Sequence, residues 1–161
     1  MAIELHVVDP ASVEAVWAMQ QYFDEIDERF AQGFDPGDAL TSGLEAMAPP
    51  TGSFVLATDG TATVGCGGVQ TIGDGIGEVK RMWVSTQTRG QGLGKRLLDR
   101  LEDECRRLGH HTVRLDTNSQ LPEAVAMYRN AGYREIERYN DNPYPDHFFE
   151  KRLATTGGAE S

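Results

Sequence analysis

The stretch Arg89-Gly90-Gln91-Gly92-Leu93-Gly94-Lys95 decides how this sequence folds, because it joins a predicted strand at 76–84 to the strongest predicted helix at 92–108. Glycines let a backbone approach a ligand without side-chain clashes. The free N–H groups and the partial positive charge of a helix N-terminus attract anions. A strand, a glycine-rich turn and a helix start, in this order, therefore predict an anion-binding site.

Two common nucleotide-binding motifs do not fit the spacing of these glycines. A P-loop has the pattern GxxxxGK[ST]. Counting back from Gly94 places Arg89 where the first glycine belongs, and Arg96 replaces the serine or threonine. A dinucleotide fingerprint has the pattern GxGxxG and an early parallel βαβ unit, whereas the glycines here are residues 90, 92 and 94. Both nucleotide motifs are therefore excluded by spacing.

Outward from this turn, the sequence predicts the element order β α α β β β α β α β β. The predicted strands cover residues 2–8, 53–58, 63–72, 76–84, 112–117, 133–138 and 146–152. The predicted helices begin at Asp9-Pro10 and at Asp35-Pro36 (through about Met47), and cover 92–108 and 122–131. Hairpin-type strands precede the main helix, so the predicted class is α/β of the α+β kind, with a mixed sheet. We expect about seven strands and four helices in one domain, residues 1–153, followed by a flexible tail at 154–161.

Two local patterns predict how the helix and the sheet pack. The helix at 92–108 carries one apolar stripe at helical spacing, made of Leu93, Leu97, Leu101, Cys105 and Leu108. The strand at 63–72 contains Gly65, Gly67 and Gly68. Glycines inside a strand indicate a bulge or a close backbone approach, so we expect one of these in this strand, the middle one of the three that precede the main helix.

Composition places the chain among small globular proteins. Its 161 residues are 39% apolar, which is enough for one core without disulfides. No apolar run is long enough to cross a membrane, and no signal peptide is visible. Cys66 and Cys105 lie far apart without a CxxC pattern, as is typical of a reducing compartment. We therefore expect a cytoplasmic protein whose cysteines are buried and unpaired.

Charge is distributed unevenly along the chain. The net charge of −10 argues against a general nucleic-acid binder. Residues 1–59 carry eleven acids and one base, whereas residues 80–100 carry six bases and one acid. Such a concentration of cations in an acidic protein favours an anion site there. The alternative interpretation is a chance cluster on a solvated helix.

At this point the chain resembles the GNAT acyltransferase superfamily. The signature [Q/R]xxGx[G/A] of that family matches Arg89, Gly92 and Gly94, five residues after the predicted strand end at Val84. The similarity continues through the strand at 76–84, the segment EAVAMYRNAGY at 123–133 and the ending DNPYPDHFFEKRL at 141–153. The element order agrees with the family as well. The resemblance implies a GNAT-like fold whose central strands, 76–84 and 112–117, splay apart.

The resemblance also implies acetyl-CoA as cosubstrate and no metal. Main-chain amides of residues 90–95 would hold the pyrophosphate, and strand 82–84 would bind the pantetheine arm. The family often has an asparagine at the position of Leu121, and here Asn118 or Gln120 would supply the missing polar contact. The implied cofactor-binding residues are Met82, Trp83, Val84, Arg89, Gly90, Gln91, Gly92, Leu93, Gly94, Lys95 and Asn118.

Aminolysis of a thioester requires a neutral amine, stabilisation of an oxyanion and a proton for the leaving thiolate. Tyr128 matches the tyrosine that protonates the thiolate in this family, and a backbone N–H near Val84 would meet the oxyanion. Glu78 corresponds to a glutamate that acts as base through water in some members, although an exposed strand carboxylate remains the competing interpretation. His147 and the acidic run at 24–28 are further candidates. A reaction without a dedicated base also stays open.

The resemblance predicts an enzyme that acetylates an amine in a ternary complex. Because the acidic residues 1–59 would line the acceptor side, we expect a small cationic molecule as acceptor, and neither nucleic acid nor membrane as partner. Two alternatives remain: a non-catalytic acyl-CoA-binding or regulatory module, and transfer to a protein N-terminus or lysine. Homodimers are common in the family, so a homodimer is possible. His110 and His111 are adjacent and do not share a face, which argues against a metal site.

Overall fold

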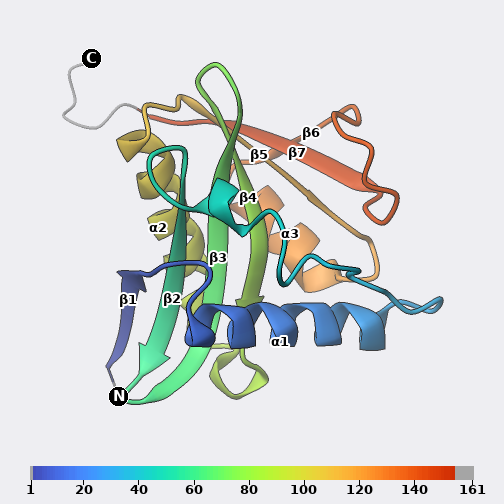
Figure 1. The fold of residues 1–161 in the computed structure, drawn as a ribbon. Helices are drawn as coiled ribbons and strands as arrows, with labels where there is room; N and C mark the ends of the chain where they lie inside the picture. The colour runs from blue at the N-terminus through green and yellow to red at the C-terminus, as the bar shows by residue number, and fades with distance from the viewer. Residues whose placement is uncertain (1, 155–161) are drawn as a thin grey trace.

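A computed structural model describes residues 2–154, so all of the predicted tail at 154–161 except Ala154 lies outside the described residues. Within residues 2–154, seven strands form one mixed sheet in the order β1-β2-β3-β4-β5-β7-β6 (Figure 1). All neighbouring strands are antiparallel except β4 and β5, which are parallel. The strands are β1 (Ile3–Val7), β2 (Gly52–Asp59), β3 (Ala62–Gly73), β4 (Ile76–Val84), β5 (Thr112–Thr117), β6 (Arg134–Ile136) and β7 (His147–Arg152). The predicted strand order and mixed sheet are confirmed.

Helices cover both faces of this sheet (Figure 1). The described residues form α1 (Val13–Arg29), α2 (Leu93–Arg107), α3 (Pro122–Asn130) and two 3-10 helices, η1 (Leu44–Met47) and η2 (Thr86–Thr88). Strand β2 shows the division between the faces, because successive side chains of a strand point to opposite sides. Phe54 and Leu56 pack in the cluster that contains α1 and η1. Val55 packs in the cluster that contains α2 and α3.

One predicted helix is wrong. The sequence predicted a helix from Asp35-Pro36 to about Met47, but residues 37–41 form turns and only η1 is helical. Gly37 has φ 63° and Gly43 has φ 78°. These left-handed conformations interrupt a right-handed helix near the start of the segment and again directly before η1. The described chain therefore has three α-helices where about four were expected.

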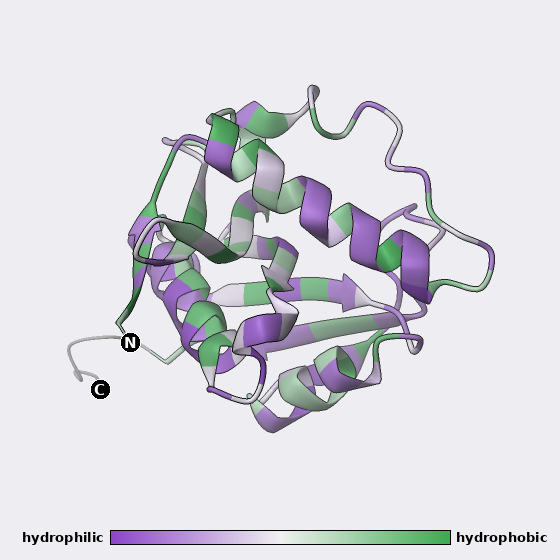
Figure 2. Ribbon diagram, turned by 90° about the horizontal axis from the view of Figure 1, so that it is seen from below, coloured by the Kyte–Doolittle hydropathy of each residue, from purple (hydrophilic) through white to green (hydrophobic). Residues whose placement is uncertain are grey.

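The predicted apolar stripe of α2 faces the sheet. Leu93, Leu97, Leu101 and Cys105 are at most 1% exposed, and Figure 2 shows hydrophobic and hydrophilic residues alternating along the helices as amphipathic packing requires. A Cβ on Gly67 would lie 2.6 Å from Leu101 Cδ1. The glycine in β3 therefore allows α2 to approach the sheet closely, which confirms one part of the glycine prediction.

Strand β4 departs from regular pairing on both of its edges. Toward β5 it pairs only through Ile76–Glu78, and beyond Glu78 the two strands separate. Toward β3, Cys66 pairs with Trp83 while Gly68 pairs with Lys80, so β4 contains an extra residue there. This is a β-bulge, and Arg81 within it has φ 57°. The predicted splay occurs here. The bulge predicted for β3 lies on its other edge, where Ala57 pairs with Gly65 and Thr58 with Thr63, so β3 contains an extra residue opposite β2.

Two further sequence expectations concern burial and hydropathy. Cys66 and Cys105 are both buried and free, as predicted. No helix in the described part of the chain is long and apolar enough to span a membrane.

Candidate active site

The glycine-rich loop presents a run of free backbone amides. Between Ala2 and Ala154, no backbone or side-chain acceptor takes the N–H groups of residues 90–92. The first helical hydrogen bond of α2 runs from the Arg96 N–H to the Gly92 carbonyl at 3.1 Å, which leaves the amides of 93–95 free as well. Gly90 and Gly92 have φ of 84° and 79°, a conformation that side chains disfavour. The loop is therefore built to receive an anion on its backbone.

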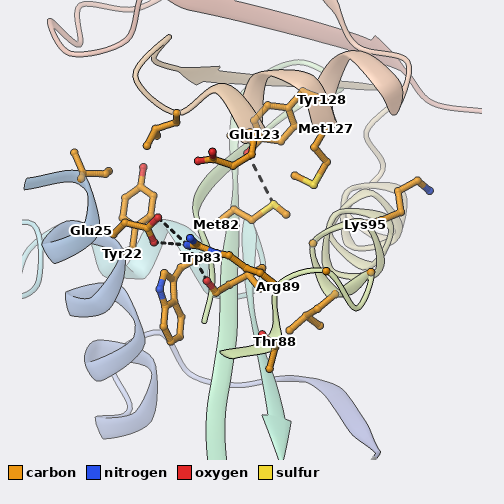
Figure 3. A pocket seen from close by; sticks show the side chains of 18 residues that line it. Tyr22, Glu25, Met82, Trp83, Thr88, Arg89, Lys95, Glu123, Met127 and Tyr128 are labelled. Carbon is orange, nitrogen blue, oxygen red and sulfur yellow. Dashed lines mark hydrogen bonds and ion pairs between the residues drawn. The ribbon is translucent and has the colours of Figure 1, made fainter. Parts of the chain in front are cut away.

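The cations near the loop already have protein partners. Arg89 donates through Nη2 to both carboxylate oxygens of Glu25 at 2.7 Å and to the Val84 carbonyl at 3.1 Å (Figure 3). Lys95 pairs with Asp99 at 2.9 Å. The Arg96 guanidinium donates to the backbone carbonyl of Ile3, which ties α2 to β1. Backbone amides, rather than free side-chain charges, dominate the anion site.

A cavity of about 370 Å³ begins at this loop and runs between β4 and α3. Every predicted cofactor-binding residue except Gln91 and Asn118 lines this cavity. Gln91 is exposed on the outside of the turn. The lining residues from β4 are Met82, Trp83 and Val84, and those from α3 include Met127 and Tyr128 (Figure 3). A narrow, mostly apolar channel thus continues from the anion site into the protein.

The open edge of β4 forms one wall of this channel. The Ser85 N–H donates to the Val64 carbonyl at 2.8 Å, and Gly65 pairs with Val84. Val84 therefore occupies a non-hydrogen-bonded position of the β3–β4 ladder, where the backbone groups point away from the partner strand. The Val84 N–H points into the gap that β5 leaves open.

Tyr128 is the first predicted catalytic residue, and it lies where the channel ends. It is 7% exposed, and its hydroxyl lies 3.9 Å from the Met82 sulfur (Figure 3). Burial raises the pKa of Tyr128, and the nearby charge of Asp116 raises it further. The hydroxyl therefore stays protonated at neutral pH and is available as a hydrogen-bond donor.

A second cavity of about 610 Å³ adjoins the first. Six residues line both: Tyr22, Ile26, Met82, Leu121, Ala124 and Tyr128. The rest of the second cavity is formed by Phe23 of α1, by residues of β3, β4 and β5, by Asn118 and by the two segments 30–39 and 139–145. Tyr128 thus lies at the junction of two cavities, one of which reaches the anion-binding loop.

Glu78, the second predicted catalytic residue, lies in the second cavity. It is 6% exposed, so it is not the exposed strand carboxylate of the competing interpretation. Its oxygens accept hydrogen bonds from Gln70 Nε2 at 2.9 Å and from the Tyr139 hydroxyl at 2.6 Å. Burial raises the pKa of Tyr139, and the charge of Glu78 raises it further. Tyr139 therefore remains a donor that orients the carboxylate.

Asn118 was predicted to bind the cofactor, but the structure places it in the second cavity. Its Nδ2 donates to the Tyr144 carbonyl, and its Oδ1 accepts from the Gln120 N–H at 2.8 Å. Gln120 Oε1 in turn accepts from the Ala31 N–H at 2.9 Å. Both amide side chains therefore fasten loops together, and Leu121 contributes an apolar surface to both cavities at the usual asparagine position.

Other candidates from the sequence lie elsewhere. Of the acidic run at 24–28, only Glu25 lines either of the two joined cavities. Its carboxylate already forms an ion pair with Arg89. His147 lines neither cavity, and its Nδ1 lies 2.6 Å from Glu135 Oε2. No group of three or more His, Cys, Asp or Glu residues in the described chain could hold a metal ion.

Sequence reasoning missed part of the second cavity. Asp116 on β5 lines it, and burial raises the pKa of that carboxyl group. Four aromatic rings, Phe23, Phe30, Phe34 and Tyr144, contact one another along its wall. Phe34 and Tyr144 come from irregular segments far apart in the sequence, so no local pattern could have indicated them.

Comparisons with known proteins agree with this arrangement. The sequence profile of the Acetyltransferase (GNAT) family matches residues 15–133. The chain is 34% identical over 141 residues to the "IAA acetyltransferase" of Azospirillum brasilense, covering 84% of this chain and 91% of the relative. A GNAT-family acetyltransferase structure from Staphylococcus aureus has a TM-score of 0.81 at 21% identity, covering 95% of this chain and 100% of that one. The PaiA N-acetyltransferase of Thermoplasma acidophilum, solved with coenzyme A, has a TM-score of 0.70 at 17% identity, covering 95% and 100%.

The fold and the two joined cavities define an acyl-CoA-dependent acyltransferase. The chain belongs to the GNAT acetyltransferase family. It is an N-acetyltransferase that uses acetyl-CoA, as the sequence predicted. The two structural likenesses support the fold alone, because both identities are low.

Proposed function

We propose that this enzyme transfers the acetyl group of acetyl-CoA to a small-molecule amine by direct attack in a ternary complex. The observation that carries the proposal is the junction at Tyr128 and Met82, which line both cavities. An acetyl group at the end of the first cavity would face an amine in the second. Cys66 and Cys105 are fully buried and line neither cavity. Neither thiol is therefore placed to take the acetyl group, and the amine would attack the thioester directly.

The residues present fit acetyl-CoA, which supplies an activated acyl thioester. The free amides of residues 90–95 would hold the pyrophosphate. The open edge of β4 at 82–84 would hold the pantetheine arm through main-chain hydrogen bonds. The Val84 N–H points into the gap between β4 and β5 and would stabilise the oxyanion.

Tyr128 would protonate the leaving thiolate, since burial keeps its hydroxyl in the protonated form. Glu78 would accept the proton of the amine through a water molecule. Hydrogen bonds from Gln70 and Tyr139 hold the Glu78 carboxylate in position. The acceptor would be a small amine whose positive charge is attracted by the carboxylates of the second cavity, Asp35, Glu78 and Asp116. Of the acidic residues within 1–59 that were expected on the acceptor side, Asp35 alone lines this cavity.

Replacement of Tyr128 by phenylalanine tests the proposal. We expect Tyr128→Phe to bind coenzyme A like the parent enzyme but to release thiol at least about 100-fold more slowly, the usual size of a lost acid–base contribution. Tyr133→Phe is the matched control, because Tyr133 is a buried neighbour whose hydroxyl donates to Glu102 and lines neither cavity. Equal turnover in the Tyr128 variant would remove Tyr128 from the reaction. Absence of any coenzyme A binding by the parent protein would overturn the whole proposal.

A further inference from the structure

We propose that the acceptor is an amino acid with an apolar side chain, whose carboxylate binds to Arg81. This inference rests on the proposed function, because it names the occupant of the second cavity. It is carried by an arginine that has no acidic partner, by carboxylates in the same cavity and by an aromatic wall.

Arg81 occupies an unusual backbone position. It is the one non-glycine residue between Ala2 and Ala154 with a positive φ, at 57°. A left-handed conformation costs a non-glycine residue about 1–2 kcal/mol, and such strain concentrates at functional sites. The bulge in β4 creates this conformation, and bulges re-aim side chains. Here the bulge turns the guanidinium into the wall of the second cavity.

The guanidinium of Arg81 is half-buried and lacks an ion pair. No carboxylate among the described residues lies within 4 Å of it. Nη1 contacts the Ala39 carbonyl and the Met19 sulfur, both at 3.1 Å, and the group lies 5.3 Å from the centre of the Phe23 ring. Nε and Nη2 donate to no atom of residues 2–154 and are not sealed from solvent. These two nitrogens present a fork that matches the geometry of a carboxylate.

Desolvation makes this arrangement costly without a ligand. Burial removes part of the hydration of the Arg81 guanidinium and thereby lowers its pKa, and no anion of residues 2–154 replaces the lost water. The neighbouring cavity cation Arg114 differs, because it pairs with Glu150 at 2.9 Å. Lys80 also lines the cavity and has no ion pair with any residue from 2 to 154, so the anion-attracting charge is concentrated on and beside the bulge.

Acidic groups line the same cavity on the two strands that separate. Glu78 accepts from Gln70 and Tyr139, and Asp116 accepts from Asn140, but neither has a cationic partner within 4 Å in the described chain. A ligand with one ammonium and one carboxylate group satisfies both kinds of unpaired charge. A diamine would face the charges of Arg81 and Lys80, and a dicarboxylate would face those of Glu78 and Asp116.

The aromatic wall indicates what the rest of the acceptor is. Phe34 lies 4.4 Å from Tyr144 and 5.6 Å from Phe23, measured between ring centres. These rings line a cavity of about 610 Å³, a size suited to small ligands, and such pockets combine apolar walls with a few polar anchors. An apolar or aromatic side chain is the natural complement.

Matched acceptors test the inference in the parent enzyme. Thiol release is measured with leucine and phenylalanine, with their amides, and with the decarboxylated amines isoamylamine and phenethylamine. Because these amines differ in pKa, kcat/KM is expressed per concentration of neutral amine. We expect kcat/KM for the amino acids to exceed that for the amides and simple amines at least about tenfold, the discrimination that a charged hydrogen-bonding pair supplies. Equal or better use of the simple amines overturns the inference and leaves acetyl transfer to small amines standing. Turnover with none of the apolar amino acids also overturns it.

Substitution of Arg81 tests whether this residue causes the preference for amino acids over simple amines. In Arg81→Gln we expect the amino-acid-to-amine preference to fall to about one, through a higher KM for the amino acids, while coenzyme A affinity stays within about twofold. Lys80→Gln removes the same charge from the same cavity, and we expect its preference to change less than about threefold. Loss of the preference in the Lys80 variant but not in the Arg81 variant would assign the carboxylate to Lys80 and overturn the role of Arg81. If neither parent nor variants bind coenzyme A, the proposed function itself fails, which is a separate outcome.

Discussion

Arg89, the first residue of the glycine motif, binds both carboxylate oxygens of Glu25 at 2.7 Å. This contact links α1 to the loop that precedes α2, at the mouth of the cofactor cavity (Figure 3). Glu25 also pairs with Arg29 at 3.3 Å, and Arg29 pairs with Glu123 on α3. A chain of alternating charges therefore connects α1, α3 and the loop that precedes α2 around the site where a polyanionic cofactor must enter.

Neutralising Glu25 should strengthen cofactor binding. Glu25→Gln removes a negative charge beside the anion site and releases the guanidinium of Arg89, so we expect coenzyme A affinity to rise by up to about fivefold, the scale of a partly exposed ion pair. The gain should shrink at high salt. Isothermal titration calorimetry at two salt concentrations measures both effects.

Glu28→Gln is the control for this prediction. Glu28 lies on the same helix, is exposed and does not line the cofactor cavity. We expect its affinity for coenzyme A to match that of the parent. Weaker binding by Glu25→Gln than by Glu28→Gln would mean that the ion pair positions Arg89 for the cofactor instead of competing with it.

The left-handed conformation of Gly92 should matter for affinity more than for stability. An added Cβ at Gly92 meets no atom within 4 Å, so Gly92→Ala is disfavoured only by its φ of 79°. That strain costs about 1–2 kcal/mol, and relaxing it would rotate the amides that face the anion. We expect the dissociation constant for coenzyme A to rise at least about tenfold.

Gly60→Ala provides the same strain away from the site. Gly60 lies in the β2–β3 turn with φ 63° and equally open surroundings. We expect a similar loss of stability in urea unfolding and unchanged coenzyme A affinity. Equal affinity in the Gly92 and Gly60 variants would show that the loop conformation does not position the amides.

The glycine loop and the leucine stripe could be predicted because each depends on contiguous residues, whereas Tyr128 became a candidate through the resemblance of residues 123–133 to the family. Arg89, Gly92 and Gly94 lie within one turn, and the stripe from Leu93 to Cys105 needs only helical periodicity. The position of the anion-binding site could then be predicted, because the strand before this loop and the helix after it fix the loop in space. The structure places most of the predicted cofactor residues along one cavity for that reason.

The acceptor side could not be predicted, because it depends on contacts between distant segments. The left-handed conformation of Arg81 follows from the β3–β4 register, in which Gly68 faces Lys80, and register is not visible in β4 alone. Phe34 and Tyr144 meet only after the loops are folded. The helix predicted from Asp35-Pro36 failed for a local reason instead, since Gly37 and Gly43 outweighed the start signal.

A buried ionic cluster on the α2 face of the sheet should dominate the response to charge removal. Glu102 is 4% exposed and accepts from the Tyr133 hydroxyl at 2.8 Å and from Lys151 Nζ at 3.1 Å. Glu102→Ala leaves both donors without an acceptor, so we expect a loss of about 3 kcal/mol in the free energy of unfolding. Asp99→Ala breaks the exposed pair with Lys95 on the same helix. We expect that variant to unfold at the urea concentration of the parent, and an equal shift in both would contradict this assignment.

Alkaline pH should destabilise the fold through its buried tyrosines, and Tyr128 and Tyr133 are two of the four whose pKa burial raises. Burial raises the pKa of both Tyr128 and Tyr133, and the negative charges of Asp116 and Glu102 respectively raise them further. In the unfolded chain each has a pKa near 10, so above that pH the unfolded state binds fewer protons than the folded state. The contribution of these two tyrosines to stability is therefore fully present below pH ~10 and is lost as pH rises, by about 1.4 kcal/mol per pH unit for each tyrosine. Urea unfolding between pH ~10 and ~12 measures this loss of stability per pH unit. We expect Tyr133→Phe to lower the loss by about 1.4 kcal/mol per pH unit, the contribution of one tyrosine. An unchanged loss per pH unit in that variant would show that Tyr133 titrates alike in both states.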